Sequence, residues 1–188
     1  MKSWFYSSVA VLALPLAAAG QGLPATNLTA FALVKEGDHF IAPQAKDKIT
    51  QIHSEKSVGS LVPDVWYVDY YDSTTAFKVT EVKFVGSKVT EIKQPKHLLD
   101  AFNGTKLLEW RKLKIDSDRA LAIALKQPLL KTTELKAAQL WLERTVVGSS
   151  WRIRFWTERL GRPGQTVDIG ELYVSSKNGE VLKNALHF

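Results

Sequence analysis

Apolar and polar side chains alternate over most of the chain, a pattern typical of β-strands with one buried face. In residues 65–72 (VWYVDYYD), Trp66 and Val68 are expected on one side of a sheet, and Tyr67 and Asp69 on the other. Similar patterns predict further strands over 76–85, 88–93, 134–144, 151–159, 167–175 and 180–183. The dipeptides at 86–87 (GS) and 178–179 (NG) are typical of tight hairpin turns.

Helical spacing of apolar residues predicts a first helix that begins at Pro43. Ala45, Ile49 and Ile52 would share its buried face. Residues 20–40, which precede it, are only weakly patterned and are interpreted as a lead-in.

A second helix is expected over 116–127, with Asp116 or Ser117 as its cap. Pro128 is expected to end it, because proline cannot continue the hydrogen-bond ladder of a helix. A short helix is also expected between Pro95 and the turn at 103–104 (NG).

Each half of the chain is thus expected to run from a helix into an antiparallel meander. The segment WYVDYYD at 66–72 corresponds in pattern to WRIRFWTE at 151–158, an offset of about 85 residues that favours an internal repeat. The expected fold class is α+β, with a helix packed on one face of an antiparallel sheet and the other face left free. The expected organisation is a signal peptide over 1–20 and two helix-plus-sheet units over 21–104 and 105–188.

The second half carries a recognisable set of features: the capped helix at 116–127, the strand WRIRFW at 151–156, and IGELYVS at 169–175 followed by an Asn-Gly turn. Over 115–186 it resembles the PepSY family of small exported domains. The first half is similar to a more degenerate copy of the same unit, because it lacks a counterpart of the strand that precedes Trp151 in the second half. The resemblance implies two tandem PepSY/cystatin-like units, similar in architecture to the β-lactamase inhibitor proteins. It also implies a non-enzymatic binding or inhibitory role, as a restraint on secreted peptidases, with no fixed set of functional residues.

The first residues follow the plan of a secretory signal peptide. Lys2 supplies a positive charge, residues 9–19 (VAVLALPLAAA) form a short apolar run, and cleavage is expected just before Gly20 or Gln21. The run is too short for a spanning helix, which needs about 20 residues, and Pro15 interrupts it. The expected location is therefore secreted or periplasmic.

Composition adds limits to this picture. The chain has 188 residues, 45% of them hydrophobic and 23% charged, as in ordinary folded proteins. The absence of cysteine excludes disulfides, thiolate metal sites and a lipoprotein anchor. The net charge of +6 fits anionic partners such as acidic proteins, lipid headgroups or nucleic acid, but it equally fits a role in solubility.

Catalytic and metal-binding patterns are weak. The histidines His39, His53, His97 and His187 have no ligand spacing, so no metal site or cofactor is expected. No nucleophile elbow is present, and a strand would send Asp69 and Asp72 to opposite faces. The chain is therefore expected not to be an enzyme. Nucleic acid is not expected as a partner, because an exported protein rarely meets it.

The most informative pattern is aromatic and basic. In residues 151–158, Trp151, Ile153 and Phe155 are assigned to the core, which leaves the alternate residues on the uncovered face. Trp, Tyr and Arg are enriched in binding hot spots. The candidate partner-binding residues on that face are Trp141, Arg152, Arg154, Trp156, Tyr67 and Tyr71, and the expected partner is another exported protein.

Three alternatives remain open. The two indoles of Trp141 and Trp156 could simply pack on each other or under the loop at 161–165. The protein could instead carry a small ligand in a pocket between helix and sheet. It could also be an enzyme with an unfamiliar site.

Overall fold

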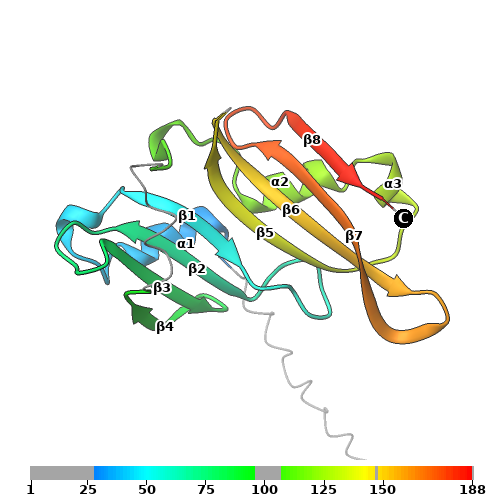
Figure 1. The fold of residues 1–188 in the computed structure, drawn as a ribbon, viewed down its shortest axis with the longest axis horizontal. Coiled ribbons are helices and arrows are strands. Elements are labelled where there is room, and N and C mark those ends of the chain that lie inside the picture. Colours follow the sequence, from blue (N-terminus) through cyan, green and yellow to red (C-terminus); the bar gives the residue numbers. More distant parts are fainter. Residues whose placement is uncertain (1–27, 96–106, 147, 188) are drawn as a thin grey trace, which may run out of the picture.

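The computed structural model describes residues 28–95, 107–146 and 148–187. The predicted signal peptide, the predicted helix before residue 103 and His97 lie outside these residues. The described chain forms one eight-stranded antiparallel sheet in the order β4-β3-β2-β1-β5-β6-β7-β8. The fold is therefore α+β, as the sequence predicted, and it is dominated by the sheet (Figure 1).

Two meanders of four strands follow one another along the chain. The first consists of β1 (Ile49–Ser54), β2 (Val65–Tyr71), β3 (Val79–Val85) and β4 (Lys88–Lys93). The second consists of β5 (Leu135–Thr145), β6 (Gly148–Arg159), β7 (Arg162–Ser175) and β8 (Val181–Leu186). The helical elements are α1 (Ala30–Gly37), η1 (Pro43–Ala45), η4 (Trp110–Lys112), α2 (Ser117–Ala124) and α3 (Pro128–Lys131).

The helix predicted to begin at Pro43 is wrong. Only Pro43–Ala45 is helical, as one 3₁₀ turn, and Ile49–Ser54 is strand β1. A β-bulge explains the error, because Ile49 pairs with Tyr70 and Gln51 with Asp69, which leaves Thr50 as an extra residue. The extra residue changes the parity of the strand and turns both Ile49 and Ile52 into the core. The first half was expected to lack a counterpart of the strand that precedes β6 in the second half. Strand β1 is that counterpart, so this expectation is wrong.

The helix of the first half is α1, in the segment read from sequence as a lead-in. Ala30, Leu33, Val34 and Gly37 are buried, which is the spacing of one helix face. Gly37 lies against Tyr70, whose hydroxyl donates to the Val34 carbonyl at 3.0 Å. A side chain at position 37 would overlap that hydroxyl group.

The predicted second helix is confirmed as α2, although it ends at Ala124. Pro128 then begins the short helix α3, a position where its missing N–H costs nothing. Helices α1 and α2 pack on the same side of the sheet, against β2 and against β6 and β7 (Figure 1). Trp151, Phe155, Phe84 and Leu140 fill the core between the helices and the sheet.

The two halves meet at β1 and β5, where only Ile52–Leu142 and His53–Trp141 are in direct register. Serine side chains continue the junction: the Ser54 hydroxyl accepts from the Leu140 N–H at 3.0 Å, and the Ser57 hydroxyl accepts from the Ala138 N–H at 2.8 Å. The sheet is therefore continuous across the middle of the molecule.

The helices also meet at this junction. One carboxylate oxygen of Asp116 accepts from the Ser117 N–H at 2.6 Å and from the Phe31 N–H at 3.1 Å, while the Ser117 hydroxyl accepts from the Ala30 N–H at 3.0 Å. Helix α1 has no cap from its own Thr29 side chain. Its first N–H groups are satisfied by the second half. No helix in the described part of the chain is long and apolar enough to cross a bilayer.

Candidate functional site

The side of the sheet opposite α1 and α2, called the outer face below, carries one row of directly paired residues across all eight strands. From β4 to β8 the row is Glu91, Lys83, Tyr67, His53, Trp141, Arg152, Tyr173 and Lys183. Adjacent strands lie about 4.8 Å apart, so the row spans roughly 34 Å. No helix of the described residues covers it (Figure 1).

In the second half, cations of the row lie over its aromatic rings. The Arg152 guanidinium is 4.3 Å from the Trp141 ring centre, and the Lys183 ammonium is 5.3 Å from that of Tyr173. Glu143 and Glu171 flank Arg152 at 3.5 and 3.8 Å. Such contacts favour fixed ring positions, and both Trp141 and Tyr173 remain partly exposed.

The Tyr173 hydroxyl donates to Glu171 at 2.8 Å. Burial, and then this bond, raise the pKa of Tyr173 to about 12. Tyr173 therefore stays a neutral hydrogen-bond donor at any physiological pH.

In the first half, rings stack directly. His53 and Tyr67 lie face to face with centres 4.8 Å apart and planes 12° apart, and the Lys83 ammonium is 5.2 Å from the Tyr67 ring. The Tyr67 hydroxyl donates to Glu55 at 2.5 Å. This bond is the main reason that the pKa of Glu55 is lowered, whereas burial is the main cause of the raised pKa of Tyr67.

A pair of buried carboxyl groups lies beside the row. Asp69 and Glu81 are direct cross-strand partners, with 1% and 4% of their surface exposed. Lys93 pairs with Glu81 at 3.0 Å, and Asp69 lies 3.6 Å from His53. Within the described residues neither carboxylate oxygen of Asp69 has a hydrogen-bond partner. Burial and then the neighbouring Glu81 raise the pKa of Asp69 well above its usual range, with Lys93 opposing.

The row includes three of the six predicted partner-binding residues: Tyr67, Trp141 and Arg152. Two others, Arg154 and Trp156, continue the same face along β6. Arg154 binds Asp168 at 2.8 Å, and its guanidinium lies 5.9 Å from the Trp156 ring.

The sixth, Tyr71, shares the outer face but pairs with Val79 at the far end of β2, outside the row. Trp141 and Trp156 make no ring contact in the described structure. Trp156 lies instead under Lys56, at 4.6 Å.

Sequence reasoning missed His53, Tyr173, Lys83 and Lys183. The alternation in 169–175 contained the signal for Tyr173. His53 had none, because the bulge in β1 made its segment resemble a helix. The described residues contain no cluster of three or more metal-binding side chains.

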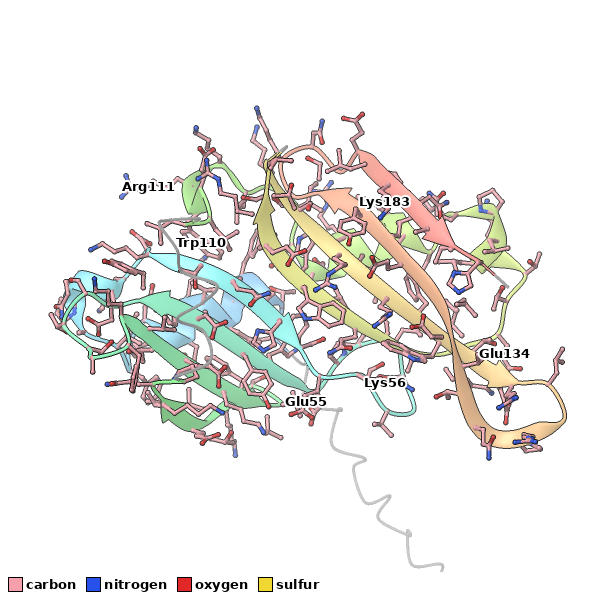
Figure 2. The ribbon with its side chains drawn as sticks, in the orientation of Figure 1. Glu55, Lys56, Trp110, Arg111, Glu134 and Lys183 are labelled. Carbon is pink, nitrogen blue, oxygen red and sulfur yellow. The ribbon has the colours of Figure 1, made fainter. Side chains whose placement is uncertain are left out.

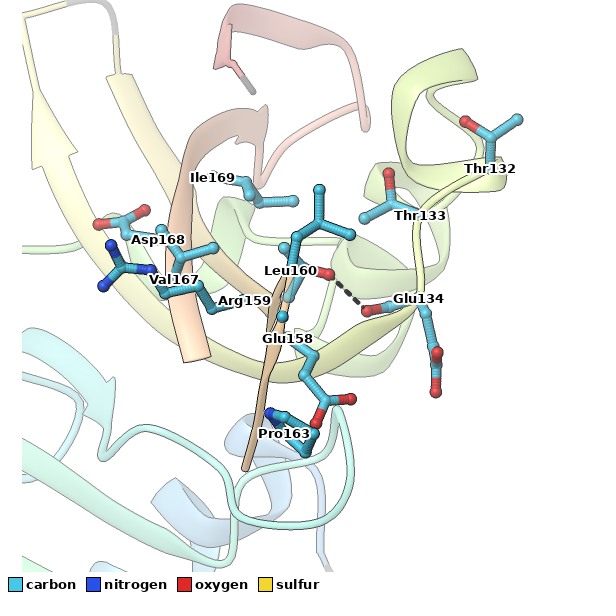
Figure 3. Close-up of a pocket in the computed structure, with 12 residues that line it drawn as sticks. Thr132, Thr133, Glu134, Glu158, Arg159, Leu160, Pro163, Val167, Asp168 and Ile169 are labelled. Atoms are coloured by element: carbon cyan, nitrogen blue, oxygen red, sulfur yellow. Dashed lines mark hydrogen bonds between the residues drawn. The ribbon is translucent and has the colours of Figure 1, made fainter. Parts of the chain in front are cut away.

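An open cleft of about 870 Å³ lies apart from the row, between the β6–β7 hairpin and the segment after α3 (Figure 3). Leu160, Val167 and Ile169 line it on one side, and Thr133 and Glu134 on the other. The Thr157 hydroxyl donates to the Glu134 carbonyl at 2.8 Å, which joins two residues of the lining.

Comparison of the chain with protein-family models, with curated proteins and with solved structures gave no match in any of the three.

Proposed function

We propose that the chain is an exported, non-catalytic module that binds another extracytoplasmic protein through its outer face. Its two helix-plus-meander halves would be tandem PepSY-like units, and its predicted signal peptide would direct it to the periplasm or the medium. A secreted peptidase is the first class of partner to test, with inhibition as the consequence of binding.

The observation that carries the proposal is the row that runs through Tyr67, Trp141, Arg152 and Tyr173. Aromatic and arginine side chains provide most of the energy in many protein interfaces, because they bury large areas at a small entropic cost. Here they are already held by stacking and ion pairs, which reduces the entropy lost on binding. A width of roughly 34 Å matches an interface of standard size.

The test compares two variants of matched chemistry. Trp141→Ala/Arg152→Glu changes the centre of the row, and Trp110→Ala/Arg111→Glu changes an adjacent Trp–Arg pair on η4 (Figure 2). Each is immobilised and used to capture proteins from an extracytoplasmic extract of the source cell. A partner retained by the parent chain is then titrated by calorimetry.

We expect the row variant to weaken binding of that partner by at least about tenfold, and the η4 variant to bind as the parent does. Circular dichroism would show that both are folded. Equal binding by the row variant would contradict the proposal. If the partner is a peptidase, its residual activity in the complex separates an inhibitor from a simple binder.

A second candidate function is favoured by the cleft at the β6–β7 hairpin. Its volume suits a small ligand, although it does not lie between helix and sheet as the sequence reading expected. Native mass spectrometry of the chain from its own source would show a bound molecule. Thr133→Trp, which fills the cleft, would remove it.

A further inference from the structure

One end of the sheet collects most of the exposed apolar side chains. This lower end, so called from Figure 1, comprises Leu28, the β1–β2 loop (55–64), the β3–β4 turn and the β6–β7 hairpin tip. Ten large apolar side chains of the described residues are exposed, and six lie here: Leu28, Val58, Val62, Val85, Leu160 and Val167. Val58 and Leu160 are 94% and 99% exposed.

The two most prominent tips are linked to the rest of the sheet by hydrogen bonds and an ion pair. The Lys56 ammonium of the β1–β2 loop donates to the Thr166 hydroxyl of the hairpin at 2.6 Å. Glu158 accepts from the Gly164 N–H at 2.7 Å and pairs with Lys136 at 3.3 Å. The apolar tips therefore project from hydrogen-bonded loops that come from opposite halves of the chain.

The lower end also favours anions. Residues 159–167 are exposed throughout and contain Arg159 and Arg162 but no acidic residue, and Lys88, which begins β4 after the β3–β4 turn, is also exposed. Of the acidic side chains at this end, Glu55 is bonded to Tyr67 and Lys83, and Glu158 to Lys136, whereas Asp64 is exposed close to the β3–β4 turn. Glu55 and Lys56 are seen side by side at this end in Figure 2.

The chain outside the described structure enters at this same end. Leu28 is fixed there by a bond from its N–H to the Ser87 hydroxyl at 3.2 Å. The residues that precede it include the apolar run 9–19. While the predicted signal peptide is still attached, the chain that leads to it is joined to the domain at this end.

From these observations we infer that the lower end docks on the surface of an anionic lipid bilayer. Separate apolar tips ringed by arginine and lysine are the arrangement by which peripheral proteins insert a few side chains and bind headgroups. A fluid bilayer accepts several separate tips, whereas a protein partner would need a matching pocket for each. The attachment is peripheral and leaves the outer face free.

The test uses the processed chain, residues 21–188, with vesicles of phosphatidylcholine alone and of equimolar phosphatidylcholine and phosphatidylglycerol. Val58→Asp/Leu160→Asp changes the two tips. The matched control is Val146→Asp, which alters a side chain 97% exposed in the β5–β6 turn at the opposite end. All three chains are checked for cooperative unfolding and then sedimented with vesicles.

We expect the parent chain and the Val146→Asp control to bind the anionic vesicles and to be released by salt. The tip variant should lose at least about tenfold in partition coefficient, since each buried Leu or Val contributes roughly that factor. The inference would be overturned if the parent chain did not bind vesicles, or if the control lost as much vesicle binding as the tip variant. It would also be overturned if the lower end bound a protein partner but no vesicles. Trp141→Ala/Arg152→Glu should bind vesicles normally, so this result is independent of the proposed partner site.

Discussion

The sharpest prediction about stability concerns Asp69. Its carboxyl group is buried beside Glu81, and neither of its oxygens has a hydrogen-bond partner within the described residues. A buried polar group left without a partner costs about 1–3 kcal/mol, and more when it is charged. We therefore expect Asp69→Asn to raise the free energy of unfolding at about pH 8 by about 1–3 kcal/mol, because the amide is neutral and can donate to Glu81.

The sign of the pH dependence follows from the direction of the pKa shift. In the fold the pKa of Asp69 lies well above its ordinary value of 3.8, chiefly because of burial. The folded protein therefore keeps a proton that the unfolded chain has already lost. The contribution of Asp69 to stability is complete below its ordinary pKa and is lost as the pH rises through the raised value.

Urea unfolding followed by tryptophan fluorescence at about pH 5 and about pH 8 measures this effect. The parent chain should lose stability between the two, and Asp69→Asn should lose less. Asp64→Asn, which changes an exposed carboxyl group in the loop before β2, is the control and should retain the parent's pH dependence. If Asp69→Asn is no more stable than the parent at about pH 8, the carboxylate is ionised and well paired, and the reasoning fails.

Two further substitutions test the junction and the β7–β8 pairing. Asp116→Ala removes the acceptor shared by the first N–H groups of α1 and α2 and should cost about 1–2 kcal/mol in urea unfolding; Asp116→Asn, which keeps an acceptor, should cost less. Gly170→Ala should cost about 1–3 kcal/mol, because Gly170 has a φ of 93° and its new side chain would overlap the Ala185 carbonyl. Gly164→Ala has a similar φ of 81° but open space around it, so thermal unfolding of the pair separates the overlap from backbone strain.

Alternation along single strands could be predicted from the sequence, and it placed Arg152, Arg154 and Trp156 on the face away from the core. It worked on β6 because Trp151, Ile153 and Phe155 form an unbroken apolar set that allows only one orientation. It failed on β1, where one extra residue gives apolar positions a spacing of three. A bulge depends on how a strand pairs with its neighbours, and the sequence of the strand alone does not contain that information.

The burial of individual side chains on the outer face could not be predicted from the sequence either. Alternation correctly placed Asp69 on the face away from the core. In a fold with helices on only one face of the sheet, a side chain on that outer face is expected to be exposed to solvent. The structure instead encloses it among neighbours from other strands, Glu81 and His53, and this enclosure causes the raised pKa. Such an environment arises from strand order and register, which pair residues far apart in the chain.

The row has a further consequence for how the two halves depend on each other. Its central pair, His53 and Trp141, belongs to neither half, since one residue comes from β1 and the other from β5. Each half alone would present four strands of the row and expose an unpaired edge at the break. The junction that closes this edge relies on Ser54 and Ser57, because direct register between β1 and β5 is short. If the outer face is the binding surface, the two meanders supply two short rows, and the serine-extended junction joins them into one surface wide enough for a protein partner.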